Sequence, residues 1–168
     1  DGDPRARNQD GAPWLETPPE TAAASLNNPT PQARYASAIP LPPYSYVPGH
    51  ELPHPVNDPN GHLYAGRDSA HEPPLTPMQL SALPTDSLSR HHALAAMLTA
   101  NPRWLFALEL FNADFYWEAH EAWESFWHAL GRTTPEARCV QGLIHLTAAC
   151  VKIREGKRAG VKSHTKKA

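Results

Sequence analysis

The distribution of proline limits where this chain can form helices. It has 19 prolines, of which seventeen lie before residue 85, and only Pro102 and Pro135 follow. Proline lacks the backbone N–H donor and fixes φ, so it interrupts helices and is excluded from central strands. We therefore expect an N-terminal half without long helices or central strands, and a C-terminal half that is free to form helices.

The N-terminal half divides into two predicted parts. Residues 1–38 are polar and rich in proline and alanine, and we expect a disordered tail. Residues 39–84 are expected to form an extended strap and a linker, because prolines alternate with tyrosines and aliphatic residues up to about residue 66. The "DPNG" stretch at 58–61 predicts a turn, in which Pro59 presets φ and Gly61 accepts a positive φ.

Residues 85–168 carry the start and stop signals of helices. Suitable N-caps are Thr85 or Asp86, then Asn101, and then Thr133 or Thr134, and Gly131 and Gly156 are suitable stops. The predicted helices cover residues 87–100, 102–111, about 114–130, 135–155 and a last segment from about 157. We therefore predict an all-α fold, a small up-and-down bundle of about three core helices preceded by a proline-rich extended arm.

The predicted helix in "FYWEAHEAWESFWHAL" (115–130) has one apolar face. A step of about 100° per residue gathers its apolar side chains into a single arc. The arc contains Phe115, Tyr116, Ala119, Ala122, Trp123, Phe126, Trp127 and Leu130. His120 lies at the edge of this arc with Glu124 one turn on, while Trp117 and Glu121 point away from it. A tryptophan on the outer face indicates that a second element covers this helix.

The predicted helix 135–155 carries two apolar stripes, which predict two packing partners. Its two cysteines, Cys139 and Cys150, would lie about 16 Å apart, too far for a disulfide, and are expected to be small buried hydrophobes. Gly142 in mid-helix favours close approach of a neighbour. The short "GRTT" link makes this helix antiparallel to the preceding one. Together the two helices predict a polar groove lined by Trp117, His120, Glu121, Glu124, Gln141 and His145.

Composition excludes some classes of partner and location. The formal net charge is −2, so no global positive field attracts nucleic acid, and we expect no nucleic-acid partner. The basic segment from Lys152 to Lys167 is typical of a solvated helix end. There is no run of about 18 apolar residues and no secretory signal at the N-terminus. We expect a cytoplasmic protein without a membrane partner, and the missing initiator methionine favours a processed chain or a fragment.

The stretch from "LELFNADFYWEAHEAWESFWHAL" to "VQGLIHLTAACVKIREGKRAGVKSH" resembles an uncharacterised family, domain of unknown function 309. Its signature is similar to F-N-x-G-x-Y/F-x-E-A-H-E-x-W-E-x-x-W followed by Q-G-L-I. The segment "PPYSYVPGHELPHPVNDPNGH" resembles an N-terminal extension of some bacterial members. The resemblance implies an all-helical fold, and it does not imply any particular activity. The family's last helix normally continues past "KSH", so the resemblance also implies a truncated last helix here.

Several interpretations of the groove stay open. His120, Glu124 and His145, with Glu121 nearby, have ligand chemistry suited to a divalent metal ion. The same groups can instead form a hydrogen-bonded network that locks the helices together. Glu121 and Glu124 are also candidate acid–base catalysts, although no nucleophile accompanies them.

We favour a binding or interaction module. The alternative is a metal-dependent enzyme of hydrolase type, which would use His120, Glu121, Glu124 and His145. The proline-rich strap is expected to pack in cis, on Trp104 or Trp117, because polyproline segments dock on aromatic grooves.

Overall fold

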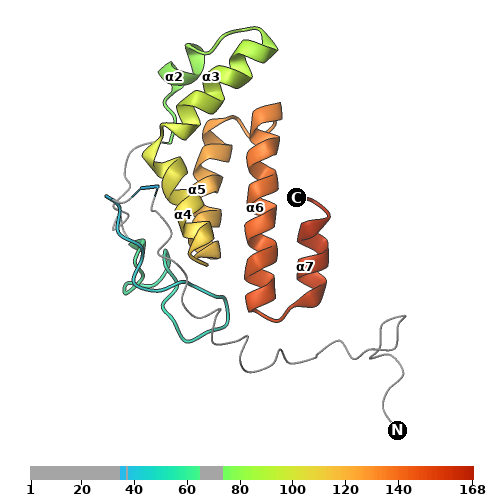
Figure 1. The fold of residues 1–168 in the computed structure, drawn as a ribbon. Helices are drawn as coiled ribbons and strands as arrows, with labels where there is room; N and C mark the ends of the chain where they lie inside the picture. The colour runs from blue at the N-terminus through green and yellow to red at the C-terminus, as the bar shows by residue number, and fades with distance from the viewer. Residues whose placement is uncertain (1–34, 37, 65–73) are drawn as a thin grey trace, which may run out of the picture. The chain divides into compact units, whose positions relative to one another are not determined.

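The computed structural model of the chain describes residues 35–36, 38–64 and 74–168 (Figure 1). All of them belong to one structural unit, Arg34–Ala168. The predicted tail over residues 1–38 lies almost wholly outside the described residues, as does the middle of the predicted linker.

Within the described part of the chain the regular structure is entirely helical, which confirms the predicted fold class. The helices are α2 (Pro77–Ser81), α3 (Ser87–Thr99), α4 (Pro102–Asn112), α5 (Tyr116–Ala129), α6 (Pro135–Arg154) and α7 (Arg158–Thr165). Helix α5 packs between α4 and α6, and α7 packs against α6 (Figure 1). The short helix α2 lies inside the segment that the sequence analysis assigns to the linker.

The helix ends lie at the predicted caps. The side chains of Asp86, Asn101 and Thr134 each accept backbone N–H groups from the first turns of α3, α4 and α6. Pro102 and Pro135 occupy the first helical positions, where a missing N–H costs nothing. Gly131 follows α5 at a φ of +85° and Gly156 follows α6 at +70°, so both stops use the left-handed conformation that glycine favours.

The core is centred on the apolar face of α5. Trp123 is 1% exposed and Phe126 is fully buried. The rings of Trp104 and Phe126 pack edge to face, with centroids 5.3 Å apart, so Trp104 belongs to this core. Ala119 of α5 and Leu130 at its C-terminal end belong to it, and buried side chains from the neighbouring helices complete it: Leu94, Ala107, Leu110, Ala137, Val140 and Ile144.

Only one of the two apolar stripes of α6 is buried. Val140, Ile144 and Val151 are buried, whereas Leu146 and Ile153 are exposed. Cys139 is exposed and Cys150 is half-buried, so the prediction that both cysteines are buried is wrong. The physical reason is the side that is covered: the C-terminal segment approaches α6 at Gly142 and Lys152, and it leaves the side with Leu146 and Ile153 exposed.

Two glycines allow the C-terminal residues to approach α6. A Cβ on Gly160 would lie 2.8 Å from the side chain of Lys152, closer than carbon atoms tolerate. A Cβ on Gly142 would lie 3.2 Å from the carbonyl oxygen of Ala168. The glycine in mid-helix therefore faces a close neighbour, as its position in the sequence suggests.

The predicted turn at 58–61 is present, but Gly61 serves a different purpose from the predicted one. The Gly61 N–H donates to the Asp58 carbonyl at 2.8 Å, and the Asn60 N–H donates to the Asp58 carboxylate at 2.8 Å. Gly61 is not among the glycines with positive φ, so that expectation is wrong. A Cβ there would instead overlap the carbonyl oxygens of His54 and Pro55, so glycine is needed for space.

None of the helices in the described residues combines the length and apolar character that crossing a membrane requires.

Candidate functional site

The first turn of α5 is covered by the proline-rich strap, residues 39–64. The ring centroid of Trp117 lies 5.4 Å from that of Tyr46 and 5.3 Å from that of His54, and both contacts are edge to face. Tyr46 and His54 also contact each other, at 5.0 Å. Trp117, rather than the core residue Trp104, is thus the tryptophan on which the strap packs, and this accounts for an aromatic residue on the outer face of α5.

Glu118 joins the strap to α5 by polar contacts. Its side chain is 2% exposed, its Oε1 accepts the backbone N–H of Tyr46 at 2.9 Å, and His62 Nε2 lies 3.5 Å from the same oxygen. Burial raises the pKa of Glu118 to about 7, because the interior disfavours the ionised form. Glu118 is not among the site residues predicted from the sequence. The available signal was its place on the helical wheel, where it lies at the edge of the apolar arc beside Ala122.

The polar face of α5 brings three potential metal ligands together. One ligand atom each from His120, Glu121 and Glu124 lies within 4.8 Å of the others. His120 Nδ1 also lies 3.4 Å from the hydroxyl of Thr147, which is fully buried on α6. Burial lowers the pKa of His120, so the imidazole is held in the neutral form that binds metal ions. We refer to these three residues as the α5 triad.

The environment of the α5 triad disfavours the ionised form of Glu121. Burial raises the pKa of Glu121 to about 7, and the nearby Glu124 contributes in the same direction. Among the described residues, no donor forms a hydrogen bond or ion pair with the Glu121 carboxylate. Glu124 Oε1 lies 3.9 Å from His128 Nε2, at the exposed end of the same face. A bound cation would relieve this repulsion.

The other predicted groove residues lie outside the α5 triad. His145 packs against His164 of α7, with ring centroids 5.8 Å apart. Burial, with a contribution from His164, lowers the pKa of His145. Gln141 is half-buried on α6. The predicted groove thus separates into the strap contact at Trp117, the α5 triad and a histidine pair between α6 and α7.

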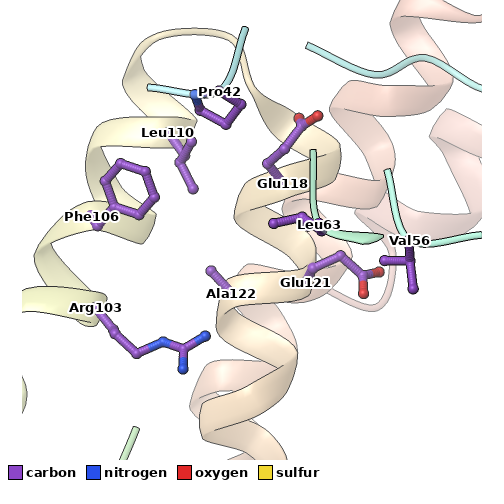
Figure 2. Close-up of a pocket in the computed structure, with 9 residues that line it drawn as sticks. All are labelled: Pro42, Val56, Leu63, Arg103, Phe106, Leu110, Glu118, Glu121 and Ala122. Carbon is purple, nitrogen blue, oxygen red and sulfur yellow. The ribbon is translucent and has the colours of Figure 1, made fainter. Parts of the chain in front are cut away.

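A pocket of about 250 Å³ lies beside the α5 triad, among α4, α5 and the strap (Figure 2). Two carboxyl groups, those of Glu118 and Glu121, line it, and Arg103 contributes the guanidinium group. The remaining lining is apolar: Pro42, Val56, Leu63, Phe106, Leu110 and Ala122. Because Glu121 lines this pocket and also belongs to the α5 triad, an ion held by the triad would lie next to the cavity.

Comparison with known families identifies one match. Residues 104–163 match the model of the family described as domain of unknown function 309. The match includes all of α5 and α6 and most of α4 and α7, and it confirms the resemblance over these residues. No curated protein and no solved structure matches the chain. The family description specifies no activity.

Proposed function

We propose that this chain is a binding module whose ligand is a divalent transition-metal ion, held on α5 by His120, Glu121 and Glu124. The observation that carries the proposal is the convergence of three ligand atoms within 4.8 Å of one another. One imidazole and two carboxylates are a donor set that Zn²⁺ and Fe²⁺ accept. A site of three protein ligands leaves at least one coordination position for water or another ligand.

The electrostatics of the α5 triad support a cation over a purely structural network. A structural network would satisfy each buried polar group with a hydrogen bond. His120 has such contacts, with Thr147 and with the backbone of Ile144. Glu121 is half-buried and has none among the described residues, and its partial burial and its neighbour Glu124 both disfavour its charge. A positive ion would stabilise both carboxylates at once.

Calorimetric titration of the chelator-treated chain, purified without a histidine tag, with ZnCl₂ tests this proposal. We expect one equivalent to bind, and we expect Glu124→Gln to weaken binding by about tenfold or more because a ligand is lost. His92→Ala, which removes an exposed histidine on α3, is the matched control and should bind as the wild type does. Absence of binding by Zn²⁺, Fe²⁺ and Mn²⁺ would show that the proposal is wrong.

The variant His145→Ala distinguishes a metal site formed by the α5 triad from one that includes His145. Since His145 pairs with His164 and lies outside the α5 triad, its removal should leave the Zn²⁺ affinity unchanged. Loss of binding in this variant would instead support the set His120, Glu124 and His145 that the sequence suggests.

A second candidate function, metal-dependent hydrolysis, is favoured by the position of Glu121. This residue belongs to the α5 triad and lines the adjacent pocket, so a metal-bound water would face a cavity large enough for a small substrate. The test is turnover of small ester and phosphate-ester substrates by the Zn²⁺-loaded chain. Hydrolysis that is lost on chelation and in His120→Ala would support the enzyme. Metal binding without turnover would leave the binding module as the function.

A further inference from the structure

The positive charge of the chain is concentrated near α7. Seven of the 15 lysines and arginines lie within residues 152–168, where Glu155 is the single acidic residue. All the other aspartates and glutamates, of 17 in the chain, lie before residue 152. A locally basic surface attracts anions even when the net charge of the protein is slightly negative. The formal net charge therefore does not describe this part of the molecule.

A groove of about 500 Å³ lies between the C-terminal end of α6 and α7, two helices that run side by side (Figure 1). Four cationic side chains line this groove: Lys152, Lys157, Arg158 and Lys162. The other lining residues, none of which has a carboxyl side chain, are Ile153, Gly156, Val161 and Thr165. The volume lies within the range of about 300–1,000 Å³ typical of pockets for small molecules.

The close packing of α7 on α6 brings cations from the two helices into one groove. A Cβ on Gly160 would lie 2.8 Å from the side chain of Lys152, so glycine is needed for α7 to approach at this point. The Lys157 N–H donates to the Lys152 carbonyl at 2.9 Å, which joins the turn between the helices to α6. Because like charges in one groove repel each other, this arrangement favours the binding of an anion.

The protein neutralises only part of this positive charge. Lys152 Nζ lies 2.6 Å from Glu155 Oε1, and Lys157 Nζ lies 2.5 Å from Glu155 Oε2. The Glu155 side chain is 1% exposed, so one buried carboxylate serves both lysines. Arg158 and Lys162 are exposed, and their side chains have no hydrogen-bond or ion-pair partner in the part of the chain that the structure describes. Two cations of the groove are therefore available to a ligand.

We propose that this groove binds a small organic phosphate, whose phosphate group contacts Arg158 and Lys162. Guanidinium and ammonium groups donate charge-assisted hydrogen bonds to phosphate oxygens. The organic part lies against Ile153, which is 62% exposed, and Val161. Covering exposed aliphatic surface favours an organic phosphate over inorganic phosphate. The proposal goes beyond metal binding, since it needs neither the ion nor the α5 triad.

Three probes separate the contribution of the phosphate from that of the apolar part: phenyl phosphate, inorganic phosphate and phenol. Each is titrated at low ionic strength into ¹⁵N-labelled full-length chain from which metal ions have been removed, and the backbone amides of α6 and α7 are followed by NMR. We expect saturable shifts with phenyl phosphate, half-complete at about a millimolar. Inorganic phosphate should bind at least about threefold more weakly because it lacks the apolar part. Phenol, which lacks the charge, should give no saturable shift.

Three variants and one control assign the binding to the groove. Arg158→Gln and Lys162→Gln each remove one charge from an exposed position, so both proteins should fold, and each should weaken phenyl phosphate binding by about three- to tenfold. Ile153→Ser should weaken phenyl phosphate binding by about threefold and leave inorganic phosphate binding unchanged. Lys166→Gln is the matched control, because it removes the same charge from an exposed position that does not line the groove. It should bind as the wild type does.

Sedimentation with vesicles of phosphatidylcholine and phosphatidylglycerol, at an ionic strength of about 0.15 M, tests whether a membrane is the partner instead. We expect the chain to stay in the supernatant, and co-sedimentation would overturn the choice of a small ligand. Equal weakening in Lys166→Gln and Lys162→Gln would also overturn the proposal, because it would indicate attraction by diffuse charge alone. So would equal binding of phenol, or no saturable shift with phenyl phosphate. Because metal ions are removed first, each result is independent of the Zn²⁺ titration.

Discussion

The two sides of α5 are built in different ways. One side faces α4 and α6 and consists of apolar side chains, of which Ala119, Trp123 and Phe126 are essentially inaccessible to solvent. The other side faces the strap and carries Trp117 and Glu118, which contact it through a few ring contacts and hydrogen bonds.

Because the two sides are built differently, the helices and the strap should respond separately to mutation. The apolar side buries many side chains from several helices, so its stability is distributed over the whole bundle. The packing of the strap depends on a few single features. Two of them are the hydrogen bond that Glu118 Oε1 accepts from the Tyr46 N–H and the space left by the missing Cβ of Gly61. We therefore expect changes on the first side to alter global unfolding and changes on the second side to alter local opening.

Trp123→Ala should change the stability of the chain most. Removing a fully buried tryptophan leaves a cavity, and we expect a loss of about 3–5 kcal/mol in the free energy of unfolding. Urea unfolding followed by far-UV circular dichroism measures this loss without depending on the 5 tryptophans as probes. Trp117→Ala is the matched control, because it removes the same side chain from the strap side. Equal losses in the two variants would contradict the difference between the two sides.

The next effect is the pH dependence that Glu118 contributes. Its pKa is raised from 4.5 to about 7 in the folded state, so between these pH values the folded chain holds a proton that the unfolded chain releases. Stability from this group therefore falls as pH rises from about 5 to 7, by on the order of 1–3 kcal/mol. The measurement is the free energy of unfolding of the metal-free chain from pH 5 to 8.

The variant Glu118→Gln isolates this contribution. It cannot titrate, so its stability should fall less steeply over the same range than that of the wild type. Part of the slope should remain, because the pKa of Glu121 is raised in the same direction. Identical slopes in the two proteins would mean that Glu118 is ionised in the folded chain at pH 5.

The smallest effect on global stability is expected from Gly61→Ala. A Cβ at residue 61 overlaps the backbone of His54 and Pro55, so the strap has to shift while the helices keep their core. We expect the far-UV unfolding midpoint to stay unchanged and the Leu63 amide, which donates to the Pro55 carbonyl at 3.0 Å, to exchange about tenfold faster or more. Asn57→Ala, at an exposed position of the strap, is the control. A lower unfolding midpoint would show that strap and helices unfold as one unit.

Much of the fold follows from local signals in the sequence. Asp86, Asn101 and Thr134 are caps followed by apolar periodicity, and each starts a helix in the structure. Such signals involve residues three or four positions apart, so they can be recognised without knowing the tertiary structure. The exposure of Cys139 and Ile153 could not be recognised in this way, because it depends on which part of the α6 surface α7 covers.

The candidate site was only partly predictable for the same reason. His120, Glu121 and Glu124 lie within two turns of one helix, so their convergence follows from helical geometry alone. The role of Glu118 depends on the backbone of Tyr46, which lies 72 positions earlier in the chain. The partner of His145 depends on the return of α7 along α6, which brings His164 beside it. Predicting contacts of this kind requires the register of the strap on α5 and of α7 on α6. The pattern of residues does not specify that register.

The distance between Tyr46 and Glu118 also has a consequence for protein synthesis. The strap is translated before the helices. At about 5–20 residues per second, roughly 4–14 s pass between the synthesis of Tyr46 and that of Glu118. During this interval the nascent strap has no helix to cover, and its exposed tyrosines and aliphatic side chains face other chains in the polysome. The prolines between them block β-sheet pairing with those chains. Proline in this segment therefore limits pairing of the nascent chain, in addition to keeping the strap of the folded protein extended.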